Sequence, residues 1–116
     1  MRKLVATSLS VAALTASLAV GAAPNAFAAP SYACHYASTE PVLSRGDTGA
    51  VVKQLQCELN NSILGGRLTV DGNFGSGTEA KVKYFQRCQG LRADGIVGHK
   101  TWTRLNHWTS SGGFGC

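Results

Sequence analysis

Two aspartates, Asp71 and Asp94, are the carboxylates of this sequence that fall within a recognisable motif. Residues 68–78 recur as residues 91–101, with Leu, Asp, Gly, Gly and Thr at the same offsets. Paired carboxylates perform acid and base catalysis when they converge on one site in different environments. Here each aspartate directly precedes a glycine, and such a pair is typical of a turn whose carboxylate accepts backbone hydrogen bonds. The repeat therefore predicts two structural turns, and we do not expect an enzyme.

The first 28 residues have the pattern of a secretory signal peptide. Arg2 and Lys3 precede an apolar run over residues 4–20, and the small residues of an A-x-A cleavage pattern follow at residues 26–28. A membrane anchor is the weaker interpretation, because Ser and Thr interrupt the run and it falls short of the roughly 20 apolar residues of a span. A lipoprotein would carry a cysteine directly after the run. We predict cleavage after Ala28 and a product that is secreted, extracellular or bound to the cell wall.

All four cysteines lie beyond this leader, at Cys34, Cys57, Cys88 and Cys116. An even number in a small exported chain predicts two disulfides, which leaves no thiol for nucleophilic catalysis. Zinc is not expected, since there is no C-x-x-C pair and the three histidines fall at no ligand spacing. The pairing that we favour joins Cys34 to Cys116 and Cys57 to Cys88, although Cys57 lies almost opposite the apolar stripe of its helix and can instead face the N-terminal arm.

The remaining elements follow from turn and capping signals. We expect an N-terminal arm over residues 29–40, a domain over residues 41–108 and a C-terminal tail over residues 109–116. A first helix is expected from a cap at Asp47 or Thr48 to about Asn60, a second from Thr78 to a stop at Gly90, and a third from Thr101. The predicted fold is all-α, a small three-helix bundle with extended segments at residues 68–70 and 91–93 that can pair as a short ribbon.

Apolar spacing predicts the core of this bundle. The helix positions expected to pack together are Val52, Leu55, Leu59, Val82, Phe85, Trp102 and Leu105. Phe74 and Val97, equivalent in the two repeats, are predicted to fill the core beneath the turns, and Gln56 and Gln86 to bind loop backbone through their amides.

The charge pattern argues against nucleic-acid binding. The formal net charge is +5, of which Arg2 and Lys3 in the leader contribute two. The other cations are scattered rather than clustered among stacking aromatic residues. We expect a solubilising surface, with at most a weak attraction to acidic polymers.

Taken together, the motifs resemble the peptidoglycan-binding domain 1 family of bacterial cell-wall proteins. The matching positions cover about residues 41–108 and are Leu43, Gly46, Gly49, Leu55-Gln56, Leu59, Val70-Asp71-Gly72, Phe74-Gly75, Thr78, Phe85-Gln86, Gly90-Leu91, residues 94–98, Thr101-Trp102 and Leu105. The resemblance implies a three-helix fold and non-covalent binding to the bacterial wall. The catalytic domain that often accompanies this family is not found in the sequence, and the two cysteine pairs are additions to the general pattern.

The resemblance implies a shallow groove beside the two turns, and we expect this groove to bind peptidoglycan. The candidate ligand-binding residues are Asp71, Gly72, Asn73, Tyr84, Arg92, Asp94, Gly95, Ile96, His99 and Lys100. We expect a stand-alone monomer without a cofactor, without nucleic acid as partner and without membrane contact after cleavage. Two alternatives remain open, namely a protein-interaction module that acts as inhibitor or accessory subunit of a wall hydrolase, and a small wall hydrolase.

Overall fold

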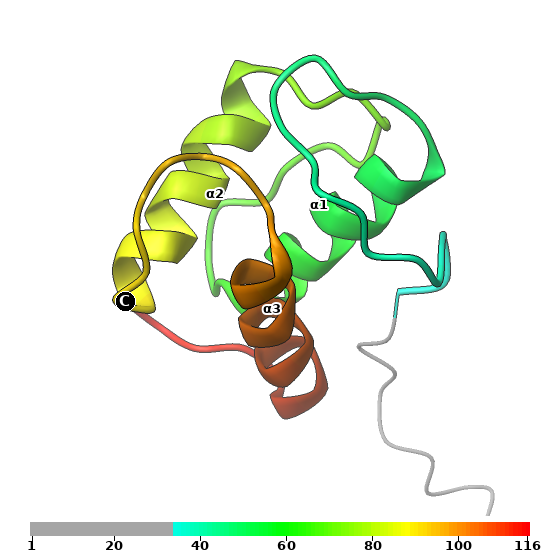
Figure 1. Cartoon of the computed structure of the whole chain (residues 1–116). Coiled ribbons are helices and arrows are strands. Elements are labelled where there is room, and N and C mark those ends of the chain that lie inside the picture. The colour runs from blue at the N-terminus through cyan, green and yellow to red at the C-terminus, as the bar shows by residue number, and fades with distance from the viewer. Residues whose placement is uncertain (1–33) are drawn as a thin grey trace, which may run out of the picture. The chain divides into compact units, whose positions relative to one another are not determined.

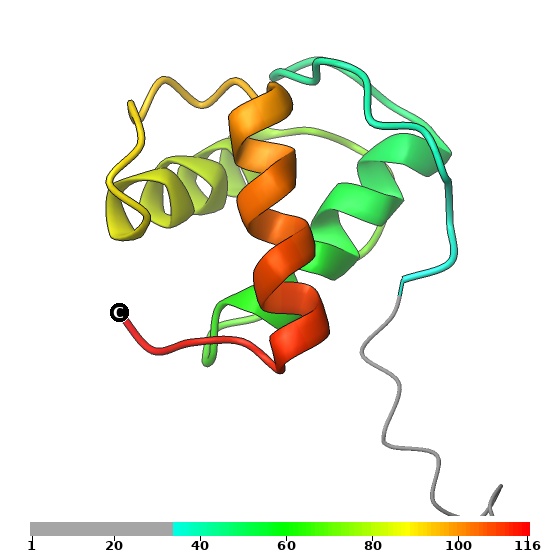
Figure 2. The ribbon, with the colours of Figure 1, turned by 60° about the horizontal axis from the view of Figure 1, so that its bottom comes forward.

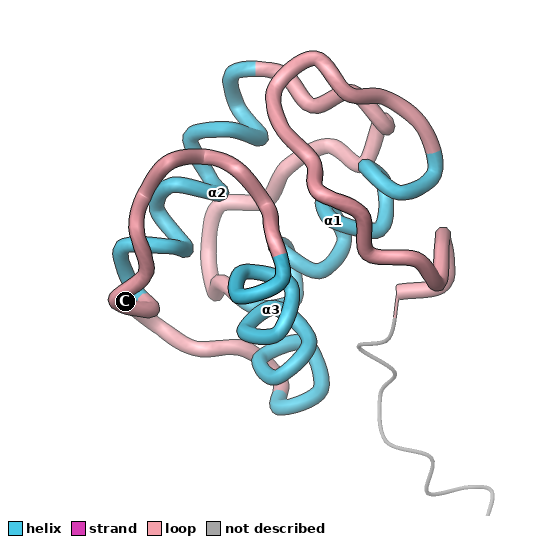
Figure 3. Tube along the Cα trace, viewed as in Figure 1, coloured by secondary structure: helices cyan, strands magenta, loops and turns pink. Residues whose placement is uncertain are grey.

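The computed structural model describes residues 34–116, and the predicted signal peptide and residues 29–33 of the predicted arm lie outside the described residues. Within residues 34–116 there are three α-helices and no strand: α1 (Ala50–Ser62), α2 (Ser76–Cys88) and α3 (His99–Ser111). α1 packs against both other helices, and more extensively against α3. Figure 1 shows this order along the chain, and Figure 3 shows that loops alone connect the helices. The predicted all-α class is therefore confirmed.

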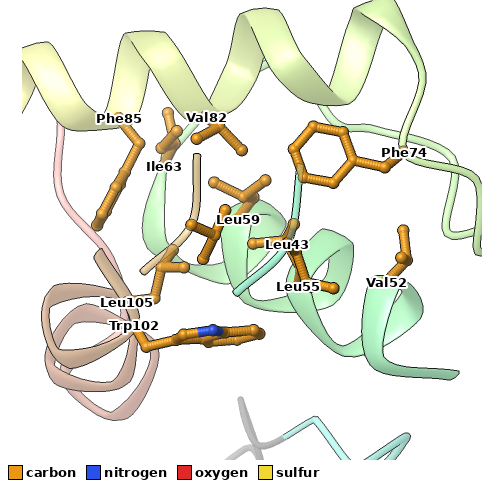
Figure 4. Close-up of a cluster of buried hydrophobic side chains, with 11 residues drawn as sticks. Leu43, Val52, Leu55, Leu59, Ile63, Phe74, Val82, Phe85, Trp102 and Leu105 are labelled. Carbon is orange, nitrogen blue, oxygen red and sulfur yellow. The ribbon is translucent and has the colours of Figure 1, made fainter. Parts of the chain in front are cut away.

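The core lies where the three helices meet and is closed by residues from the loops (Figure 4). The helix residues predicted for it are all buried, and they are joined by Leu43, Ile63, Phe74 and Val97. Trp102 is completely buried, and its indole N–H donates to the Pro41 carbonyl oxygen at 2.8 Å. The prediction that Phe74 and Val97 fill the core is confirmed. Because none of the three helices reaches the length at which an isolated helix is stable in water, this burial must provide much of the stability.

The segment before α1 connects the two repeated turns. Leu43 pairs with Val97 through hydrogen bonds of 3.1 and 2.8 Å, while the N–H of Phe74 donates to the Asp47 carbonyl oxygen at 2.9 Å. The predicted ribbon between residues 68–70 and 91–93 is wrong. Each turn instead pairs with the segment before α1, which thereby holds the two turns in a fixed relation.

The predicted helix starts are also wrong by a few residues. α1 begins at Ala50 after Gly49, not at a cap provided by Asp47 or Thr48. α2 begins at Ser76 and α3 at His99, each two residues before the predicted threonine. The reason is that both threonine side chains are buried and occupied by glutamine amides, so extended glycines precede the helices in their place.

The helix ends agree better with the sequence. α2 stops before Gly90 as expected, and α1 ends two residues beyond the predicted Asn60. α3 continues to Ser111, so its last turn occupies residues assigned to the C-terminal tail. After α3 the chain turns back across the bundle, where Figure 2 shows its end leaving the helix towards α2. Phe114 packs there, with its ring 5.8 Å from that of Phe85.

The disulfides differ from the favoured pairing. Cys34 is joined to Cys57, and Cys88 to Cys116. Cys57 lies on the side of α1 that faces the arm, which is the alternative that its position opposite the apolar stripe had left open. Cys88 ends α2, and the C-terminus lies beside that end (Figure 1). Each bridge therefore fastens one terminal segment to a helix, and no bridge joins two helices.

Candidate functional site

The first repeated turn, residues 71–75 (turn 1), is held by one buried side chain of α1. The amide nitrogen of Gln56 donates to Asp71 Oδ1 at 3.0 Å, to the Asn73 carbonyl oxygen at 3.0 Å and to Thr78 Oγ1 at 3.1 Å. Its amide oxygen accepts from the Gly72 N–H at 2.9 Å. A buried amide needs such partners, and Gln56 finds them in the turn and in the first turn of α2.

Gln86 of α2 repeats this arrangement in the second turn, residues 94–98 (turn 2). Its amide nitrogen donates to Asp94 Oδ1 at 3.2 Å, to the Ile96 carbonyl oxygen at 2.9 Å and to Thr101 Oγ1 at 3.2 Å. Its amide oxygen accepts from the Gly95 N–H at 2.9 Å. The predicted role of both glutamines in binding loop backbone is confirmed, and the duplicated sequence corresponds to a duplicated hydrogen-bond network.

The two aspartates have the turn role that the sequence predicted. Asp71 Oδ1 accepts from the Asn73 N–H, and Asp94 Oδ1 from the Ile96 N–H, both at 2.9 Å. The hydrogen bond from Asn73, reinforced by that from Gln56, lowers the pKa of Asp71 below its usual 3.8. An aspartate that is kept ionised in this way acts as a hydrogen-bond acceptor and does not suit the role of a general acid.

The structural repeat is longer than the sequence motif. Lys53 and Lys83 stand three residues before Gln56 and Gln86, and the aliphatic part of each lysine lies against the glycine of its turn. The sequence only weakly indicates that the repeat includes the lysine and the glutamine of the preceding helix. Gln56 precedes Asp71 by 15 residues, whereas Gln86 precedes Asp94 by only 8. A longer loop after α1 accounts for the difference and conceals the repeat from a fixed-offset comparison.

A pocket of about 480 Å³ opens beside turn 2, and we call it the turn-2 pocket. Its floor is formed by the buried Gln86 and Thr101, and its rim by exposed side chains of the turn and of the first turn of α3. The lining residues are Gln86, Gly90, Leu91, Arg92, Asp94, Ile96, Gly98, His99, Lys100 and Thr101. Ile96 is 45% exposed, so that its side chain adds apolar surface to the rim.

An equivalent pocket of about 320 Å³ opens beside turn 1, and we call it the turn-1 pocket. It is lined by Gln56, Leu68, Thr69, Asp71, Asn73, Gly75, Ser76, Gly77 and Thr78. Each of these positions corresponds to a lining residue of the turn-2 pocket, because both pockets form between a repeated turn and the helix that follows it.

Seven of the ten predicted site residues line these two pockets. Five of them lie together in the turn-2 pocket (Arg92, Asp94, Ile96, His99 and Lys100), and Asp71 and Asn73 line the turn-1 pocket. Gly72 and Gly95 are buried behind the turns, where their N–H groups are bonded to the glutamines. Tyr84 lies elsewhere, in a separate hollow of about 350 Å³ between α2 and the loop after α1, and its hydroxyl donates to the Cys116 carbonyl oxygen at 3.1 Å.

Several pocket residues were missed by the sequence reasoning. They include Leu68, Thr69, Gly75, Ser76, Gly77, Leu91 and Gly98, and most of them are small. The repeat itself could have identified them, since each occupies the offset of a residue that lines the other pocket. Trp108 of α3 packs against the core, and its indole N–H donates to Gln89 Oε1 at 2.9 Å.

Comparison with known proteins places this architecture among cell-wall proteins. The model of a family described as putative peptidoglycan binding domain matches residues 48–105. An uncharacterised protein of Kitasatospora aureofaciens is 48% identical over 102 residues, which are 85% of this chain and 86% of that protein. The zinc D-Ala-D-Ala carboxypeptidase of Streptomyces albus G is 42% identical over 64 residues, which are 54% of this chain and only 25% of the enzyme.

The solved structures include a peptidoglycan-binding protein from Clostridioides difficile, crystallised with glutamine hydroxamate. It is 41% identical, with a TM-score of 0.57, and the match covers 63% of this chain and 45% of that protein. The family match spans α1, α2, both turns and the first half of α3, the same elements that form the two pockets. On the family match and the similarity to this solved structure, this chain belongs to the putative peptidoglycan-binding domain family.

Proposed function

We propose that this protein is a secreted module that binds bacterial peptidoglycan non-covalently and acts without a catalytic domain of its own. The observation that carries the proposal is the pair of equivalent pockets beside turns 1 and 2, inside the segment that matches the family model. Most of the rim residues are exposed, whereas the glutamines and threonines that hold the turns are buried and hydrogen-bonded to one another. A rigid scaffold with an accessible polar rim suits the binding of a polymer.

The chemistry of the described residues supports a binding role over catalysis. The carboxylates of the two turns are occupied by hydrogen bonds that hold the turns together. All four cysteines are in disulfides, so none can act as a nucleophile. No helix within residues 34–116 has the length and apolar character needed to cross a membrane.

Secretion and independent action rest on separate grounds. The leader pattern predicts export, and two disulfides are typical of small proteins in an oxidising compartment. The Kitasatospora relative aligns with this chain over most of both lengths, which supports a binding module that acts by itself.

Co-sedimentation with purified insoluble peptidoglycan tests the proposed function. We expect the oxidised protein to pellet with the wall in a saturable manner and to stay in solution with cellulose particles. Ile96→Asp should weaken pelleting, because it places a charge at the rim of the turn-2 pocket. Tyr36→Asp is the matched control, since Tyr36 is 47% exposed, lies on the arm and gives the same change in charge.

The result that would contradict the proposal is a protein that stays in solution at all wall concentrations. The interaction-module alternative would then be tested by capture of a hydrolase from culture supernatant. Clearing of a peptidoglycan zymogram would instead show a hydrolase.

A further inference from the structure

The turn-1 and turn-2 pockets share a framework but differ in charge, so each can be compared with the other within the same protein. Both have a glutamine floor, an aspartate and a buried threonine in the same places. At four rim positions the turn-1 pocket has small polar or neutral residues where the turn-2 pocket has larger ones. The pairs, turn 1 first, are Thr69 and Arg92, Asn73 and Ile96, Ser76 and His99, and Gly77 and Lys100.

The substitutions reverse the balance of charge. Asp71 is the one charged residue that lines the turn-1 pocket, whereas Arg92 and Lys100 outnumber Asp94 in the turn-2 pocket. Arg104, one helical turn beyond Lys100, adds a further cation nearby through its bond of 3.2 Å to Gln89 Oε1. The potential of the turn-2 pocket is therefore more positive than that of its counterpart.

The cations that line the turn-2 pocket, Arg92 and Lys100, have no hydrogen-bond or ion-pair partner among residues 34–116. Among residues 34–116 the one ion pair within 4 Å joins Arg45 to Glu79, at 3.4 Å. Arg92 and Lys100 are both exposed, and neither side chain has a hydrogen bond or ion pair with another described residue. Their charges are therefore available to a ligand, and a guanidinium is well suited to a carboxylate because it can donate two parallel hydrogen bonds.

The rest of the pocket limits what such a ligand can be. Asp94 also lines the pocket, and its negative charge repels a ligand with several negative charges, such as a polyphosphate. Leu91 and the exposed Ile96 add apolar surface beside the cations. A single carboxylate next to a small aliphatic group fits this combination. In peptidoglycan such groups occur on the stem peptide, whereas the sugars offer mainly hydroxyl and amide groups.

We propose that the turn-2 pocket binds a free carboxylate of the peptidoglycan stem peptide, with Arg92 and Lys100 as charged contacts and Ile96 against the adjoining aliphatic side chain. This inference rests on the proposed function and adds the recognised group to it. The turn-1 pocket lacks the two cations and serves as the internal negative control.

The test is an NMR titration of the full disulfide-bonded protein with two synthetic probes. One probe is a stem tetrapeptide that ends in D-alanine with its carboxylates free, and the other is the same peptide with every carboxylate amidated. We expect the free peptide to bind about tenfold or more tightly than the amidated one, as for loss of a charge-assisted hydrogen bond. Amide shifts should be confined to residues 90–101.

Variants assign the effect to the two cations. Arg92→Thr introduces the residue found at the same place in the turn-1 pocket, and Lys100→Gln removes the second charge with little change in size. Each should reduce the preference for the free peptide several-fold. Arg87→Gln is the control, because Arg87 is an exposed arginine of α2 that lines neither pocket. A dispersed amide spectrum shows for each variant that the fold is retained.

The outcomes separate this inference from the proposed function. Equal affinity for the two probes, or no peptide binding by a protein that still pellets with intact wall, would overturn the inference and leave wall binding in place. Shifts centred on turn 1 would overturn it as well. A protein that binds neither peptide nor wall would overturn both.

Discussion

The side-chain oxygen of Gln86 accepts a hydrogen bond of 2.9 Å from the backbone N–H of Gly95, so that α2 fixes the turn from which α3 begins. Gln56 holds Gly72 over the same distance, and α1 thereby fixes the start of α2. Each of the first two helices thus positions the next helix through one buried amide. The pockets beside the turns depend on these two glutamines, although neither glutamine is exposed to bind a ligand itself.

The first prediction concerns these amides. Gln86→Leu and Gln56→Leu should each lower the free energy of unfolding by about 2–4 kcal/mol, because several buried donors and acceptors of a turn lose their partner together. Urea denaturation followed by far-UV circular dichroism measures the loss. Arg87→Gln, next to Gln86 but exposed, should change stability by no more than about 0.5 kcal/mol. Equal stability of Gln86→Leu and the parent protein would show that the network is not needed.

The second prediction concerns the path of the C-terminal tail across the bundle. Gly113 has a φ of +92°, and a Cβ there would lie 2.6 Å from the Asn61 carbonyl oxygen. Because this oxygen belongs to the backbone, a side-chain rotation cannot relieve the clash. Gly113→Ala should therefore destabilise the fold by about 1–3 kcal/mol in thermal unfolding. A Cβ at Gly115 meets nothing within 4 Å, so Gly115→Ala should leave the melting temperature unchanged. Equal effects of the two substitutions would contradict the tail position.

The third prediction concerns pH and the buried Glu58. Gln54 donates to its Oε1 at 2.8 Å, but its Oε2 is buried and has no hydrogen-bond partner among the described residues. Burial raises the pKa of Glu58 above the usual 4.5, against the opposing effect of Gln54 and with a small contribution from Glu40. The folded state then holds this proton more tightly than the unfolded chain. The stability from this proton is complete below pH 4.5 and is lost as the pH rises through the higher pKa of the folded state.

Denaturation curves at several pH values above 4.5 measure this effect. Glu58→Gln cannot ionise and should flatten the decline in stability that the parent protein shows. Glu79→Gln is the control, since Glu79 pairs with Arg45 at the surface, and it should retain the decline. If Glu58→Gln declines as steeply as the parent protein, another group is responsible.

The fourth prediction concerns the disulfides. A peptide map without reduction should show Cys34 with Cys57 and Cys88 with Cys116. Replacing Cys88 and Cys116 together by serine opens a loop of 28 residues and should cost about 3–4 kcal/mol in the chain-entropy model. The matched experiment on the other bridge opens a loop of 23 residues, and a similar loss is expected. A map with Cys57 joined to Cys88 would contradict the structure.

Local sequence signals determined much of this protein. The spacing of Val52, Leu55 and Leu59 defined a helix face, and an Asp followed by Gly defined each turn, because these preferences depend on near neighbours along the chain. The same signals identified Phe74 and Val97 as core residues. They also identified most of the candidate site residues, since these residues lie in or next to the turns.

Long-range contacts decided what the local signals could not. Thr78 and Thr101 look like helix caps, yet glutamines on a preceding helix bind their hydroxyl groups, and the helices therefore begin two residues earlier. The pairing of Cys57 depended on which neighbour faces the outer side of α1. The likeness of the two pockets was equally hidden, because Gln56 and Gln86 lie at unequal distances along the sequence from the turns that they hold. Such relations arise only when segments distant in the chain pack together, and the tertiary structure alone shows them.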